Sequence, residues 1–157
     1  MIWRADMPGS ASDGGFTLVE LLVVIAILGV MLALVGISAR PVSPATHAHS
    51  AAQEISGALR AARSAALMSN RSVAFTLDLA PPGYQWGTQS RRALPADIKL
   101  ALMTGQDQVV SANRGRIRFD PDGASSGGRV SIQGGGQLWM VGVDWLSGRV
   151  SVVHAAH

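Results

Sequence analysis

The sequence predicts an α+β protein: a long apolar N-terminal helix, kinked near two prolines, then a small antiparallel β head that carries one further helix. Three observations support this. In residues 16–37 only Thr17, Glu20, Gly29 and Gly36 are neither alanine nor large apolar residues. Residues 48–69 have the apolar spacing of a helix, and from residue 72 the pattern alternates with a period of two.

Composition narrows the class of protein. The chain has 157 residues, of which 48% are hydrophobic and 15% charged, and it contains no cysteine. A disordered chain is excluded by the apolar content. Disulfides, cysteine-based zinc sites and thiol nucleophiles are excluded by the missing cysteine. The formal net charge of +3 is too small to indicate a nucleic-acid-binding protein by itself.

The apolar segment, residues 16–37, is long enough for a membrane. As a helix it spans roughly 33 Å at about 1.5 Å per residue, and a hydrocarbon core is about 30 Å thick. A cleaved secretory signal has a shorter apolar run, and here only Ala39 offers a small residue for its cleavage site. An ordinary uncleaved anchor fits the length but does not explain Glu20. We expect a leader over residues 1–15, a transmembrane or assembly helix over 16–39 and a head over 40–157.

Glu20 lies five residues into this segment. An acid near a helix end is tolerated at the membrane interface and favoured by the helix dipole. The alternative is a dedicated cationic partner, because an acid within a membrane segment is a functional candidate by default.

The sequence around Glu20 resembles a processing site. The run Gly14-Gly15-Phe16-Thr17-Leu18-Val19-Glu20, followed by an unbroken apolar stretch, is similar to that of type IV pilins and type II secretion pseudopilins. The resemblance implies cleavage by a prepilin peptidase after Gly15, N-methylation of Phe16 as the mature N-terminus, and Glu20 as the fifth mature residue. The amine of Phe16 in an incoming subunit could then neutralise Glu20 of its neighbour and select one stacking register.

The leader departs from the family pattern. Family leaders are typically basic, whereas residues 1–15 hold Arg4 together with Asp6 and Asp13. Orientation is therefore only weakly encoded by charge. Met7 is an alternative start that would give a nine-residue leader, and the sequence does not decide between Met1 and Met7.

The head begins with a predicted joint and a helix. Pro41 and Pro44 predict a kink or unwound segment over residues 40–46. The helix that follows, about 48–69, carries one apolar stripe that we expect to pack on a sheet: Ala51, Ile55, Leu59, Ala62 and Ala66. His47 and His49 are two residues apart with no acid beside them, so they are poor metal ligands.

Seven strands are expected after the helix, in one or two antiparallel sheets: Ser72–Leu79, Tyr84–Thr88, Ile98–Met103, Arg116–Asp120, Val130–Gln133, Gln137–Trp145 and Arg149–Val153. Trp139 and Trp145 are six residues apart and would face inward together on one strand. Leu146-Ser147-Gly148 predicts a hairpin connection. The tail with His154 and His157 is expected to fray.

The resemblance extends into the head. Three stretches are similar to the GspH family of minor pseudopilins, which is related to the FimT-type minor pilins: Leu59–Ala66 followed by Asn70–Val73, Ile117–Gly128 followed by the strand Arg129–Gln133, and Val143–Val150. This implies a minor subunit of a type II secretion system near the filament tip, with a single pass of the inner membrane and a periplasmic head. Its partners would be other pseudopilins, major and minor, and prepilin peptidase. The alternatives are a type IV minor pilin acting in pilus initiation or DNA uptake, and an anchored periplasmic binding domain that is never processed.

The remaining motifs indicate no catalytic, metal or cofactor site. Asp120-Pro121-Asp122-Gly123 is better explained as a turn than as a calcium loop, because no further acids follow at the required spacing. The glycines of residues 123–128 lack the ending of a phosphate loop, and no nucleophile–base set is indicated. We therefore expect no enzyme activity.

One cationic strip remains. Arg114, Arg116 and Arg118 alternate with Gly115, Ile117 and Phe119, so a strand would place the three guanidinium groups on one face. That face is either a solvated exterior or a strip for an acidic partner or nucleic acid, with Arg91 and Arg92 nearby in the second case.

Overall fold

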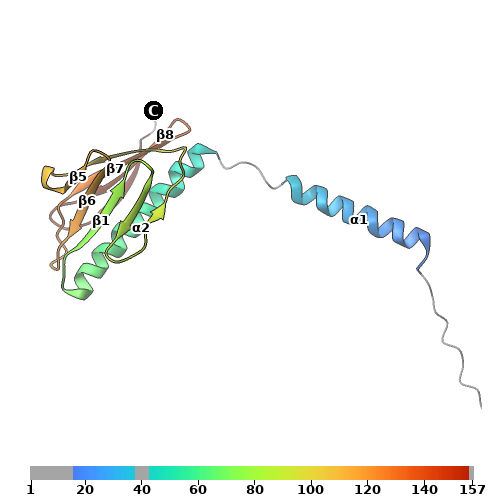
Figure 1. Ribbon diagram of the computed structural model, residues 1–157, viewed down its shortest axis with the longest axis horizontal. Helices are drawn as coiled ribbons and strands as arrows, with labels where there is room; N and C mark the ends of the chain where they lie inside the picture. The colour runs from blue at the N-terminus through green and yellow to red at the C-terminus, as the bar shows by residue number, and fades with distance from the viewer. Residues whose placement is uncertain (1–15, 38–42, 156–157) are drawn as a thin grey trace, which may run out of the picture. The chain divides into compact units, whose positions relative to one another are not determined.

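The computed structural model describes residues 16–37 and 43–155 (Figure 1). The chain divides into two compact units, Met1–Pro41 and Val42–His157. The predicted leader, Gly15, the segment 38–42 with Pro41, and His157 lie outside the described residues.

The N-terminal unit contains one helix, α1 (Leu18–Ile37). Thr17 starts it, since its backbone carbonyl accepts from Leu21 N–H and its hydroxyl from Glu20 N–H, each at 3.2 Å. Every side chain described for this unit, Phe16 through Ala33, is exposed. Within the described residues, no helix combines the length and apolarity required to cross a membrane. The transmembrane expectation for residues 16–39 stays a prediction.

The second unit opens with helix α2 (Pro44–Ser69), which is four residues longer at its start than expected. The predicted joint over residues 40–46 is therefore wrong for 44–46. Proline is tolerated at the first helical position, where its missing N–H would be unpaired anyway. Ser43 caps this end by accepting from Thr46 N–H at 3.3 Å. The helix ends at Asn70, which adopts the left-handed conformation (φ 51°).

Two antiparallel sheets follow. The first has the order β3 (Arg92–Ala93), β2 (Gly83–Trp86), β1 (Val73–Asp78), β6 (Arg114–Phe119), β5 (Val109–Ser111). The second has the order β4 (Lys99–Met103), β7 (Gly128–Gly134), β8 (Gln137–Val143), β9 (Val150–Ala155). A short 3-10 helix, η1 (Gln106–Gln108), precedes β5. The predicted α+β architecture with antiparallel pairing is confirmed.

The core of the head lies between α2 and both sheets. All five residues of the predicted stripe are at most 1% exposed, and they pack with inward-facing residues of both sheets: Phe75, Leu77, Ile117, Phe119, Val130, Ile132 and Val141. Because the helix face and the alternate strand positions share one apolar interior, α2 is fixed against the sheets by burial.

The start of α2 packs closely against the β7–β8 turn. A side chain at Gly134 would meet the Pro44 carbonyl oxygen at 2.5 Å, and one at Gly135 (φ 55°) would meet Ala45 N at 2.6 Å. The turn therefore needs glycine for this close approach, and at Gly135 also for its backbone conformation.

Three details of the strand prediction are wrong. β3 and β5 were not expected, because two- and three-residue edge strands carry too little alternation to be recognised. β8 ends at Val143, so Trp145 lies in the following turn, 66% exposed, instead of facing inward with Trp139. β9 continues to Ala155, so His154 lies in a strand and not in a frayed tail.

Candidate functional sites

The predicted processing segment is exposed where the structure describes it. Phe16 is 83% exposed and Glu20 lies in the first turn of α1. Among residues 16–37 and 43–155, no cationic side chain forms a salt bridge with Glu20. Gly15 lies outside the described residues, so its role and those of Phe16 and Glu20 stay predictions.

The three arginines of the predicted strip share the exposed face of β6. Burial alternates along the strand, with Arg114, Arg116 and Arg118 outside and Gly115, Ile117 and Phe119 buried. The register with β1 sets Arg114 opposite Asp78 and Arg116 opposite Thr76.

Acidic side chains engage much of this strip. The Arg114 guanidinium pairs with Asp78, and Arg91 Nε donates to the same carboxylate at 2.9 Å. Burial would raise the pKa of Asp78, but the hydrogen bonds from Arg114 and Arg91 outweigh it and hold that pKa below its usual value. Arg118 lies 3.2 Å from Asp120. In the described part of the chain, Arg116 is the one member of the strip with no salt bridge.

The histidines form contacts that the sequence did not reveal. His47 Nδ1 lies 2.8 Å from Asp97 Oδ2, so an acid does lie beside it, brought there across fifty residues of sequence. His49 and His154 both stack on Trp139, with ring centroids 4.5 and 4.4 Å from that of the indole. No group of three or more potential metal ligands occurs among the described residues.

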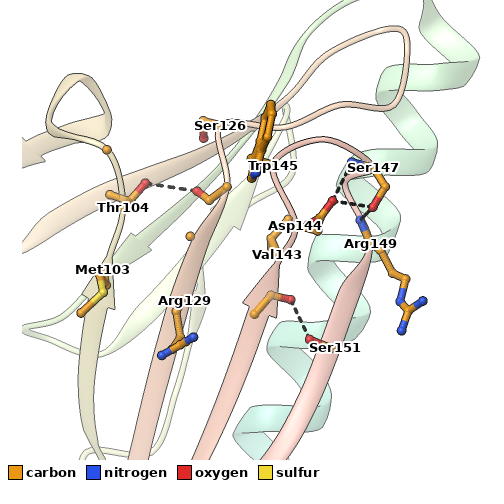
Figure 2. Close-up of a pocket in the computed structure, with 14 residues that line it drawn as sticks. Met103, Thr104, Ser126, Arg129, Val143, Asp144, Trp145, Ser147, Arg149 and Ser151 are labelled. Atoms are coloured by element: carbon orange, nitrogen blue, oxygen red, sulfur yellow. Dashed lines mark hydrogen bonds between the residues drawn. The ribbon is translucent and has the colours of Figure 1, made fainter.

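A groove of about 880 Å³ lies at the end of the four-stranded sheet (Figure 2). Met103 and Thr104 line one side of the groove, Arg129 and Ser151 line it from the strands, and Trp145 stands at its rim. The Thr104 hydroxyl donates to the Gly127 carbonyl oxygen at 3.4 Å.

The acid of this groove, Asp144, serves the turn after β8. Its carboxylate accepts from the hydroxyl and the N–H of Ser147 at 2.7 and 2.8 Å, as Figure 2 shows. These hydrogen bonds lower the pKa of Asp144. The carboxylate is occupied in holding the hairpin, which favours a structural role over acid–base chemistry.

Comparison with known proteins relates the sequence to one family. Residues 51–148 match the family model "Type II transport protein GspH", and residues 11–36 match the prokaryotic N-terminal methylation motif. The type II secretion system protein H of Xanthomonas campestris pv. campestris is 31% identical over 139 residues, covering 87% of this chain and 80% of that protein.

Solved structures show the same fold. A structure of the minor pseudopilin EpsH from the type II secretion system of Vibrio cholerae matches with a TM-score of 0.56 and 15% identity, covering 71% of this chain and 96% of that one. The type IV minor pilin FimU of Pseudomonas aeruginosa matches with a TM-score of 0.51 and 16% identity, covering 67% and 91%. The matched head, the methylation motif and the shared fold together show that this chain belongs to the GspH family of type II transport proteins, with the fold of a minor pseudopilin.

Proposed function

We propose that this chain is a minor pseudopilin subunit of a type II protein secretion system. Prepilin peptidase cleaves it between Gly15 and Phe16, and it is assembled into the periplasmic pseudopilus near the tip. The observation that carries the proposal is the joining of a processing motif ahead of α1 to a head that matches GspH over residues 51–148. The role is structural: the subunit works through contacts with other pseudopilins, major and minor.

The exposed apolar surface of α1 supports a change of environment during assembly. Before assembly the helix is buried in the inner membrane as a single pass, with the head in the periplasm. In the filament, contacts with neighbouring helices replace contacts with lipid. The transfer joins two apolar environments, so extraction does not require exposing the helix to water.

Glu20 and the new N-terminus supply the specificity of this step. Methylated Phe16 keeps a cationic amine, and Glu20 has no salt-bridge partner among the described residues. An unpaired charge among apolar helices is costly. A register that sets the amine of one subunit beside Glu20 of the next is therefore favoured over registers that leave both unpaired.

A second candidate is a type IV minor pilin that acts in pilus initiation or DNA uptake. The fold likeness to FimU and the arginines of β6 favour it. The salt bridges of Arg114 and Arg118 weaken it, because cations already paired with acids offer less to phosphates.

Two measurements test the proposal. Co-expression with a prepilin peptidase, followed by intact-mass analysis, should show loss of residues 1–15 and methylation, and Gly15→Val should block both. An unprocessed wild-type chain would leave only the reading of an anchored binding domain.

The second measurement compares the culture supernatants of a deletion strain and its parent. Secreted hydrolases should disappear from the medium and collect in the periplasm. An unchanged supernatant would favour the pilus.

The pairing of Glu20 with the amine is tested by a variant. Glu20→Ala should be processed normally but fail to join the filament, and normal incorporation would overturn this pairing.

A further inference from the structure

A cationic pocket lies between α2 and the β8–β9 turn. Its volume is about 510 Å³, and its lining contains three arginines, two serines and no carboxylate: Arg60, Arg63, Ser64, Ser147, Gly148, Arg149 and Val150. Two turns of helix and one hairpin, more than eighty residues apart in sequence, thus bring three guanidinium groups together. The pocket is separate from the arginines of β6, which belong to the other sheet.

The three pocket arginines form no salt bridge within the part of the chain that the structure describes. In contrast, Arg91, Arg92, Arg114 and Arg118 each form one. Arg60 donates to the Ser56 hydroxyl at 3.4 Å, and Arg63 Nε donates to the Gly123 carbonyl oxygen at 3.3 Å. Both interactions position a guanidinium group without neutralising it.

Asp144 is the acid on which Arg149 acts. Arg149 contributes to lowering its pKa, after the hydrogen bonds from Ser147. The Asp144 carboxylate lies outside the pocket lining and is bound to Ser147. The pocket therefore keeps an excess of positive charge.

The hairpin side of the pocket is closely packed. Gly148 has a φ of 61°, and a side chain there would meet the Gly123 carbonyl oxygen and Arg63 Nε, the latter at 2.9 Å. The hairpin is thus seated directly on α2. Arg63, whose Nε is held by the Gly123 carbonyl oxygen, therefore loses less conformational entropy when a ligand binds.

Exposed apolar side chains lie beside the pocket. Trp145 and Leu146 are 66% and 67% exposed, in the turn that also supplies Ser147. Ser147 and Arg149 line both this pocket and the groove of Figure 2, where Trp145 stands at the rim. Tryptophan and arginine are among the residues enriched at the positions that contribute most to binding in protein interfaces.

We propose that this pocket binds a carboxylate side chain presented by a neighbouring protein, with apolar residues of that protein lying on Trp145 and Leu146. The identification of the neighbour as another pseudopilin rests on the proposed function. Guanidinium groups bind carboxylates with charge-assisted hydrogen bonds. The Ser64 hydroxyl adds a donor, whereas the Ser147 hydroxyl already donates to Asp144. A pocket of this size, next to a turn with exposed apolar side chains, suits one acidic side chain better than a nucleic-acid backbone, which needs a long track of cations.

The test uses the full chain in detergent micelles, labelled with ¹⁵N-arginine, and the capped peptide acetyl-Leu-Glu-Glu-Leu-amide. The Nε–H signals of Arg60, Arg63 and Arg149 should shift and saturate, while that of Arg116 stays in place. Arg116 is an exposed arginine without a salt bridge on the other sheet, and so is a matched internal control. The peptide acetyl-Leu-Gln-Gln-Leu-amide should cause no shift. Equal shifts at Arg116, equal binding of the glutamine peptide, or no binding would overturn the proposal.

Variants give the magnitude. Arg60→Glu combined with Arg149→Glu should weaken peptide binding by about tenfold or more, whereas Arg116→Glu should change it less than twofold. Both arginines are exposed, so thermal unfolding of the double variant should match that of the control. Equal losses in the two variants would reveal general charge attraction and overturn the assignment.

Competition distinguishes the source of the anion. Inorganic phosphate or a single-stranded oligonucleotide that binds the pocket more tightly than the acidic peptide would overturn the choice of a carboxylate partner.

Processing and secretion measured in cells distinguish a failure of this inference from a failure of the proposed function. The double variant should be processed like the wild type but should reduce secretion, and normal secretion would overturn the inference. If the wild-type chain is itself unprocessed, or its deletion leaves secretion unchanged, the proposed function fails whatever the peptide does.

Discussion

The two helices of this chain differ in where they find their packing partners. In α2, one stripe is buried against two sheets while the opposite face is exposed. In α1, every described side chain from Leu18 to Ala33 is exposed, although the helix is far more apolar. The apolar stripe of α2 is thus buried within its own subunit. An exposed apolar surface such as that of α1 is typical of a segment that packs against other molecules or a membrane.

The largest expected effect comes from deleting core volume under α2. Leu59 is fully buried, so Leu59→Ala should lower the free energy of unfolding of the head by about 2–5 kcal/mol. The matched change in α1, Val24→Ala, should alter it by less than about 0.5 kcal/mol. Urea unfolding of the full chain in detergent measures both. A large loss in Val24→Ala would show that α1 does stabilise the head.

The seating of the hairpin on α2 gives the next effect. Gly148 and Gly136 both have positive φ values, 61° and 78°, but only Gly148 faces α2 closely. Gly136→Ala should cost about 1 kcal/mol of unfolding free energy from backbone strain alone. Gly148→Ala should cost more, about 2–3 kcal/mol, because it also displaces Arg63 or the hairpin. Equal losses would show that the close approach contributes nothing.

A hydrogen bond from sheet to helix gives a pH-dependent effect. Tyr84 OH donates to Glu54 at 2.9 Å, and burial together with this bond raises the pKa of Tyr84 from 10.0 to about 12. The folded state thus favours the neutral phenol. Its contribution to stability is complete below pH 10 and is lost as the pH rises from 10 towards 12. Tyr84→Phe should lower the free energy of unfolding by about 1 kcal/mol at pH 7. It should also remove the decrease of that free energy between pH 10 and pH 12. A retained slope would assign it to other groups.

The two helix glutamates give the smallest and sharpest contrast. Glu54 accepts from Tyr84 and lies 3.5 Å from Arg92, so Glu54→Gln should destabilise the head by roughly 0.5–1 kcal/mol. Glu20→Gln should leave unfolding of the head unchanged and should act only on incorporation into a filament, which cross-linking of assembled subunits measures. Loss of head stability in Glu20→Gln would contradict the division between the helices.

Local pattern was enough to predict the elements with strong periodicity. The stripe from Ala51 to Ala66 and the alternation of Arg114 to Phe119 each place several residues on one face, and the structure has both faces as expected. The two-residue β3 and the early start of α2 depend on pairing and capping, which such periodicity does not encode. Trp145 was misplaced because its spacing from Trp139 carries information only if the strand continues.

The candidate sites divide in the same way. The processing motif is contiguous, so the sequence displays it in full. The pocket of Arg60, Arg63 and Arg149 joins α2 to a distant hairpin, as does the contact of His47 with Asp97. Such groups become neighbours only when the core positions the helix on the sheet.

The close packing of Gly134 and Gly135 against the first turn of α2 has a mechanical consequence. The chain enters the head at Ser43, and any tension along it arrives at Pro44 and Ala45, where the β7–β8 turn is in direct contact. That turn is itself anchored by the antiparallel pairing of β7 with β8. The end of α2 that receives the tension is therefore the end packed against the second sheet, and this packing opposes unwinding of the helix from its first turn.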